Sequence, residues 1–146
     1  MVSAMAACNN ATDHAGHRAD GYSHKPENAE DSLFQLVMDG HDVAMGKMGK
    51  IKGFQEQAKK ALDSIAKLPA GAARNQLEQA YKSVQEDLNY SVFSMDSWME
   101  AFEPDSAKDD NAKRLEYLQS EADKVGKLKT GILATLARAD SLMGVK

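Results

Sequence analysis

Three long stretches of the chain repeat apolar residues at alternating steps of four and three, the spacing that gathers side chains on one face of an α-helix. They cover about residues 27–67, 72–102 and 107–143, with short breaks between them. We therefore predict three long helices, each on the order of 50 Å at 1.5 Å per residue. The predicted core-facing positions are Val37, His41, Ala44, Met48, Ile51, Gln55, Ala58, Leu62 and Ile65 in the first helix, Leu77, Tyr81, Val84, Leu88, Ser91, Met95, Trp98 and Phe102 in the second, and Leu115, Leu118, Ala122, Val125, Lys129, Ile132, Leu136, Ala139 and Met143 in the third, which Leu128 and Leu133 widen.

Two breaks separate these helices. Pro69 disfavours the helical conformation of the residue before it, and Gly71 supplies a flexible corner. Pro104 ends the second helix, and Ser106 with Asp109 three residues later is typical of a capping box that starts the third. Long helices joined by short turns predict an all-α fold, an antiparallel up-down-up three-helix bundle.

Composition agrees with a single helical domain and argues against several functions. The chain has 146 residues, of which 42% are hydrophobic, enough for one continuous core. Its 18 basic and 22 acidic residues are interspersed, without the basic stripe that nucleic-acid binding needs. Because the chain also has no phosphate-binding glycine loop, no Cys-x-x-Cys pair and no His-Glu-x-x-His motif, we expect neither a nucleic-acid partner nor an enzyme.

The beginning of the chain predicts an exported protein. Cys8, the only cysteine, follows small and apolar residues, as at the end of a bacterial lipoprotein signal whose cysteine becomes lipidated. The run is shorter than a full signal and lacks its basic start, so we expect the natural protein to begin further upstream. A cytosolic protein with an ordinary N-terminal cysteine is the alternative. We expect the lipid to hold the protein on the periplasmic side of the cell envelope, or at the cell surface.

Residues 9–26 are polar and small, a composition that predicts a flexible tether between the lipid and residues 27–146. His14, His17 and His24 lie in this tether. Histidine-rich tails can bind Cu(II), zinc or nickel loosely, although three histidines are also common in a solvated tail.

Two helical segments concentrate methionine beside histidine or tryptophan. In each segment the residues step by three and four and so project from one side of the helix. If the turn between the first two helices centres at about residue 69.5, facing residues of an antiparallel pair sum to about 139, because both helices rise equally per residue. His41 then lies opposite Trp98, so the two segments should meet at one end of the bundle. The residues are His41, Met45 and Met48 in the first segment, and Met95, Trp98 and Met99 in the second.

Thioethers and an imidazole are the ligands that Cu(I), a soft cation, prefers. The Trp98 ring can cover such a cation, and Asp42 or Asp96 can fix the tautomer of His41 by a hydrogen bond. Core packing is the commoner explanation of such a cluster, because methionine fills gaps in helical cores and packs well on tryptophan.

The same two segments resemble a known group of proteins. They are His-Asp-x-x-Met-x-x-Met from His41 and Met-x-x-Trp-Met from Met95. This pair resembles segments of small helical lipoproteins of Bacteroidetes-type bacteria, many of which are labelled viral A-type inclusion proteins. The resemblance implies a helical fold and an envelope location, and it implies no particular reaction. The group often has proline between the two methionines of the first segment, where this chain has Gly46-Lys47.

Two functions follow as expectations. The first is an envelope lipoprotein that binds Cu(I), or a similar soft ion, through His41, Met45, Met48, Met95 and Met99 beside Trp98, for sequestration or delivery. The second is a non-catalytic structural or protein-interaction module of the envelope, whose methionine cluster is core packing. A ligand site needs accessible side chains, whereas a core cluster should be dry and filled.

Overall fold

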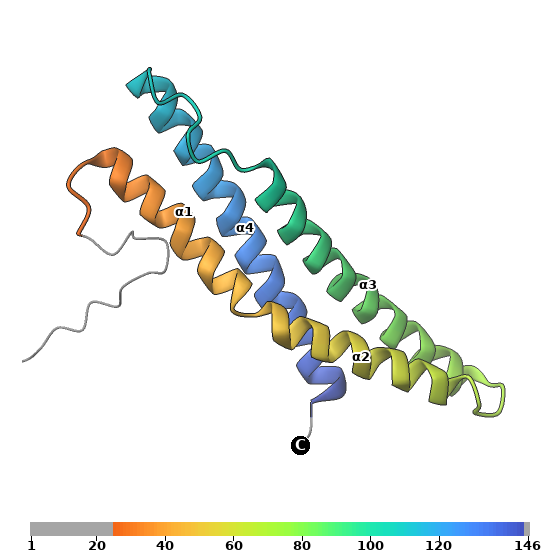
Figure 1. Cartoon of the computed structure of the whole chain (residues 1–146). Helices are drawn as coiled ribbons and strands as arrows, with labels where there is room; N and C mark the ends of the chain where they lie inside the picture. The colour runs from red at the N-terminus through yellow and green to blue at the C-terminus, as the bar shows by residue number, and fades with distance from the viewer. Residues whose placement is uncertain (1–24, 145–146) are drawn as a thin grey trace, which may run out of the picture.

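The computed structural model describes residues 25–144, in which all regular secondary structure is helical. The helices are α1 (Ala29–Met45), α2 (Met48–Ile65), α3 (Ala72–Ala101) and α4 (Asn111–Met143). Figure 1 shows them packed together in an elongated bundle, so the predicted all-helical bundle is confirmed. Cys8 and nearly all of the predicted tether lie outside the described residues.

The first predicted helix is in fact two helices with a bend between them, so the prediction of one continuous helix was wrong. The backbone N–H of Lys47 donates to the carbonyl oxygen of Ala44, three residues back, at 3.0 Å. Such a bond tightens the turn, and Gly46 and Gly49 weaken the helix on either side. The bend lets α1 pack mainly on α4 and α2 mainly on α3, as Figure 1 shows.

The last helix begins at Asn111 and not near residue 107. Ala107 has a φ of 58°, in the left-handed region, which interrupts a right-handed helix. The capping residue is Asp110, whose side chain accepts the backbone N–H three residues later at 3.2 Å. The predicted capping box of Ser106 and Asp109 was therefore wrong, and the true cap lies one residue after Asp109.

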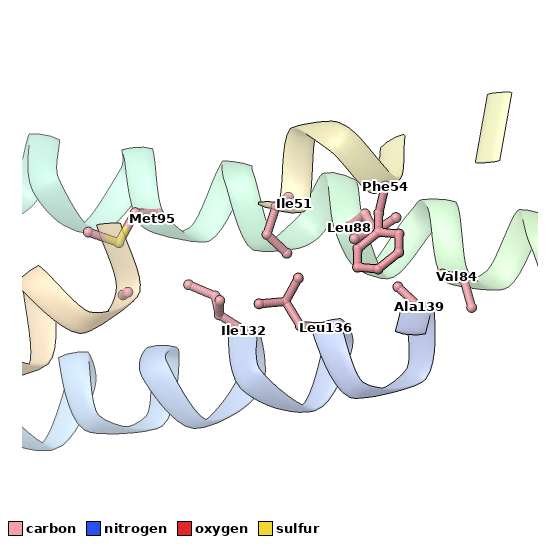
Figure 2. Packing of buried hydrophobic residues seen from close by; sticks show 9 residues of the cluster. Ile51, Phe54, Val84, Leu88, Met95, Ile132, Leu136 and Ala139 are labelled. Carbon is pink, nitrogen blue, oxygen red and sulfur yellow. The ribbon is translucent and has the colours of Figure 1, made fainter. Parts of the chain in front are cut away.

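The hydrophobic core runs along the axis of the bundle, between α2, α3 and α4 over much of its length (Figure 2). Most predicted core-facing positions are buried or half-buried. Leu77 and Leu133 are exceptions, with 39% and 40% of their surface exposed. The largest fully buried side chains are Ile51, Leu88, Met95, Leu118, Ile132, Val37 and Val125.

The part of the bundle that contains α1 depends on a close approach between α1 and α4. Gly40 is buried, and a Cβ atom at this position would lie 2.8 Å from Cγ1 of Val125. Because a side chain would collide there, glycine is what lets α1 lie against α4 at this level.

A buried arginine links several elements at the same end of the bundle. The Arg114 side chain on α4 is 4% exposed and donates from Nε to Oε1 of Glu30 on α1 at 2.8 Å. It also donates to the carbonyl oxygen of Ser106 at 2.9 Å. Arg114 therefore joins α1, α4 and the segment between α3 and α4.

Candidate functional site

The contact between His41 of α1 and Trp98 of α3 forms the centre of the candidate site. Their ring centroids are 5.8 Å apart, and the ring planes are inclined by 40°. The predicted juxtaposition of these two side chains is thus confirmed. The His41 side chain is 23% exposed, so solvent reaches part of the imidazole.

A carboxylate orients the imidazole of His41. Nδ1 of His41 lies 2.9 Å from Oδ1 of Asp42, the next residue of α1. When Nδ1 donates its proton to this carboxylate, a neutral imidazole keeps the lone pair of Nε2 free for a ligand bond. Of the two aspartates considered from the sequence, Asp42 makes this hydrogen bond, and Asp96 is an exposed residue of α3.

The four methionines divide into two pairs. Met95 is completely buried in the core, where Figure 2 shows its side chain directed toward the interior between the helices, and the half-buried Met48 packs against the same cluster. Met45 and Met99 are partly exposed, at 39% and 36%. Met45 follows His41 by one helical turn and so lies on the same side of α1. The accessible donor groups are therefore the imidazole of His41 and the thioethers of Met45 and Met99.

Glu121 of α4 holds the edge of the Trp98 ring, a contact that the sequence analysis did not predict. Nε1 of Trp98 donates to Oε2 of Glu121 at 2.9 Å, and Nζ of Lys124 lies 2.7 Å from Oε1. Glu121 is only 4% exposed. Its hydrogen bond and its charge raise the pKa of Lys124. The only signal in the sequence is the spacing of Glu121 and Lys124, three residues apart on one helix.

Aromatic side chains close the end of the bundle beside this site. The ring of Phe102 stacks on Trp98 with centroids 5.0 Å apart, and on Tyr117 at 6.3 Å. Phe34 of α1 lies 6.3 Å from Phe102. The hydroxyl of Tyr117 accepts the backbone N–H of Glu103 at 2.8 Å. His41 therefore lies between an aromatic cluster at the bundle end and the core that contains Met95.

Replacement of Glu121 with alanine is expected to destabilise the protein by about 1–3 kcal/mol, because the indole N–H of Trp98 loses its buried acceptor. Glu121→Gln keeps an acceptor and should cost less. Urea unfolding measures the free energy. Trp98 is the only tryptophan, so all tryptophan emission comes from this ring, and we expect a red shift in Glu121→Ala. Equal stability of wild type and Glu121→Ala would contradict this role.

No family model, curated protein or solved structure matches this chain. Within residues 25–144, no three or more histidine, cysteine, aspartate or glutamate side chains are grouped so as to hold a metal ion. In the same part of the chain, no helix has both the length and the apolar composition needed to cross a bilayer.

Proposed function

We propose that the protein binds Cu(I), or a similarly soft metal ion, at His41 and the partly exposed thioethers of Met45 and Met99. The observation that carries this proposal is the arrangement of His41, with Nδ1 held by Asp42 at 2.9 Å and the ring 5.8 Å from Trp98. An imidazole fixed in this way is pre-oriented for coordination through Nε2.

Methionine sulfur supplies the soft character of the proposed site. Cu(I) accepts neutral thioether ligands and few of them, and it needs no carboxylate. Met45 and Met99 have accessible surface, whereas Met48 and Met95 belong to the packed core. We therefore assign His41, Met45 and Met99 as ligands and the other two methionines as the support beneath them.

Trp98 has a second role beside the ligands. An indole ring attracts a cation at its face, and a ring next to Cu(I) also hinders access of oxidants. The hydrogen bond to Glu121 and the stacking on Phe102 restrict the motion of this ring. A ring that is already ordered loses little entropy when the ion binds.

The cellular role that we propose is sequestration or delivery of the ion at the envelope, with no catalytic step. The lipoprotein-like sequence before Cys8 and the resemblance to small helical lipoproteins support this location. An antiparallel arrangement of the long helices supports the site, since it would bring α1 and α3 to the same end of the bundle; the contact of His41 with Trp98 fits this register.

Anaerobic Cu(I) titration against a colorimetric chelator tests the proposal. The protein should carry Cys8→Ser and glutamine in place of His14, His17 and His24, because a thiol or the tail histidines would otherwise bind copper themselves. We expect one Cu(I) per chain and quenching of Trp98. His41→Gln should lower the affinity by at least about 100-fold, as loss of an outer hydrogen-bond partner alone costs 10–100-fold.

Matched variants separate ligands from core residues. Met45→Leu and Met99→Leu keep the side-chain volume and should weaken Cu(I) binding, whereas Met143→Leu, at the far end of α4, should leave it unchanged. Asp42→Ala removes the partner of Nδ1 and should lower the affinity by about tenfold. If the background protein does not compete with the chelator, the metal proposal is wrong.

The second candidate function is a structural or protein-interaction module of the envelope. The complete burial of Met95 favours it, as do the exposed aromatic side chains of Tyr90 and Phe93, at 69% and 66%. Exposed aromatic groups are common at the centres of protein interfaces. Absence of Cu(I) binding together with a lower stability of His41→Gln would favour this candidate.

A further inference from the structure

A pocket between α3 and α4 lies apart from the contact of His41 with Trp98. Its volume is about 310 Å³. Leu128 and Ile132 of α4 contribute apolar side chains to its wall, and Tyr90 of α3 is also one of its lining residues. This size is at the lower end of the range for small-molecule sites, so the pocket suits a small ligand.

A glycine of α4 forms part of the lining of this pocket. Gly131 is one of the lining residues, and a Cβ atom built on it would meet no atom within 4 Å beyond its local helix. Glycine in the middle of a helix as long as α4 is less stable than alanine. At Gly131 a larger side chain therefore has open space beside the pocket lining.

Two polar groups on the wall lack partners within residues 25–144. Oγ of Ser94 is buried and makes no hydrogen bond there. Such a buried hydroxyl calls for a partner, which a ligand oxygen can supply. Lys127 also lines the pocket and has no ion pair in the described part of the chain, whereas the neighbouring Lys124 is held by Glu121 at 2.7 Å.

We propose that this pocket binds a small amphiphilic anion, a carboxylate or sulfonate attached to an aromatic or short aliphatic group. The apolar group packs on Leu128 and Ile132, the negative charge pairs with Lys127, and an anion oxygen accepts a hydrogen bond from Ser94. Because Lys127 is positively charged and lies beside an apolar wall, the pocket should favour an anion over a neutral or cationic molecule. This inference does not depend on metal binding.

Titration of the full chain with 1-anilinonaphthalene-8-sulfonate, without copper, tests the proposal. We expect saturable, blue-shifted fluorescence with one site per chain. N-phenyl-1-naphthylamine has the same aromatic rings without the sulfonate and should bind at least about tenfold more weakly, since it cannot pair with Lys127.

Variants place the probe in this pocket. Gly131→Leu should fill the pocket and abolish saturable binding. Gly53→Leu is the control: it makes the same substitution on α2, where a Cβ would also have no atom within 4 Å, and should bind the probe like wild type. Lys127→Gln and Ser94→Ala should each raise the Kd by about three- to tenfold. Thermal unfolding followed by circular dichroism shows that each variant is folded.

Three results would overturn the proposal: no saturable binding to wild type, equal affinity for both probes, or unchanged affinity in Lys127→Gln. Lys127 is exposed on the surface of α4, so its replacement tests the charge even if Gly131→Leu fails to fold.

Discussion

The variant Gly40→Leu is expected to lose about 3 kcal/mol of folding free energy and to separate α1 from α4. A Cβ at Gly40 would lie 2.8 Å from Cγ1 and 3.4 Å from Cγ2 of Val125, so the helices must move apart to accept it. Overpacking of a filled core costs about 1–3 kcal/mol, and leucine adds three further carbon atoms, which places this variant at the upper end. Equilibrium urea unfolding, followed by far-UV circular dichroism, measures the loss.

Gly53→Leu provides the matched control for this variant. It makes the same substitution on α2, where a Cβ would meet no atom within 4 Å. Since leucine is the better helix former, Gly53→Leu should gain about 0.5–1 kcal/mol. The same chemical change then has opposite signs at the two sites. Equal stability of Gly40→Leu and wild type would show that α1 does not depend on this close approach.

A compensating substitution makes the test sharper. Val125→Ala removes the two methyl groups that Gly40→Leu would strike. The double variant should therefore be more stable than the sum of the two single changes predicts. His41 follows Gly40 directly on α1, so displacement of the helix should also change the emission of Trp98, and the compensating substitution should restore it.

The helical fold was predictable because burial in a long amphipathic helix follows the helical period. Val84 and Leu88 on α3, and Ile132 and Leu136 on α4, were assigned to the core from spacing alone, and all four are buried. The exposed Leu133 shows the limit of this argument. It follows Ile132 by one residue, or about 100° of rotation, and the pattern of one helix does not fix how wide a face its neighbours cover.

The bend between α1 and α2 was not predictable from periodicity. Ala44, Met48 and Ile51 keep the steps of four and three across it, so the apolar pattern continues through the break. The local signal was the pair of glycines, Gly46 and Gly49, whose effect depends on which helices pack on either side. That packing is a tertiary property, since α1 pairs mainly with α4 and α2 mainly with α3.

Buried charges were missed for a related reason. Arg114 and Glu121 count as surface residues in any hydrophobic pattern, yet they are 3% and 4% exposed. Each is buried because a distant residue satisfies it: Glu30 pairs with Arg114, and Trp98 donates to Glu121. Contacts across the bundle of this kind leave no periodic trace in the sequence.

The sequence predicted the height along the bundle at which the candidate site lies, but not the direction in which each side chain points around its helix. Equal rise per residue gave the height at which His41 meets Trp98, and the contact is present. The same argument carries no information on which side of its helix each thioether lies relative to solvent. Met95 and Met99 are one turn apart on α3, and the first is fully buried while the second is 36% exposed.

Variants of Met95 test whether this side chain is core packing or a copper ligand. Met95→Ala is expected to destabilise the protein by about 2–5 kcal/mol, because it leaves a cavity in the core cluster that also contains Ile51 and Ile132. Met95→Leu keeps nearly the same volume and should cost less than about 1.5 kcal/mol. Urea unfolding measures both values, and the difference between them separates loss of volume from loss of sulfur.

Cu(I) affinity of the stable variant then decides the role of this sulfur atom. In the site that we propose, Met95 supports the ligands from beneath, so Met95→Leu should bind Cu(I) like wild type while His41→Gln does not. An equal loss of affinity in both variants would make Met95 a ligand. Because its side chain has no exposed surface, the bundle end would then have to open for the ion to enter. Such opening would appear as faster amide hydrogen exchange near Met95 than in the core around Leu88.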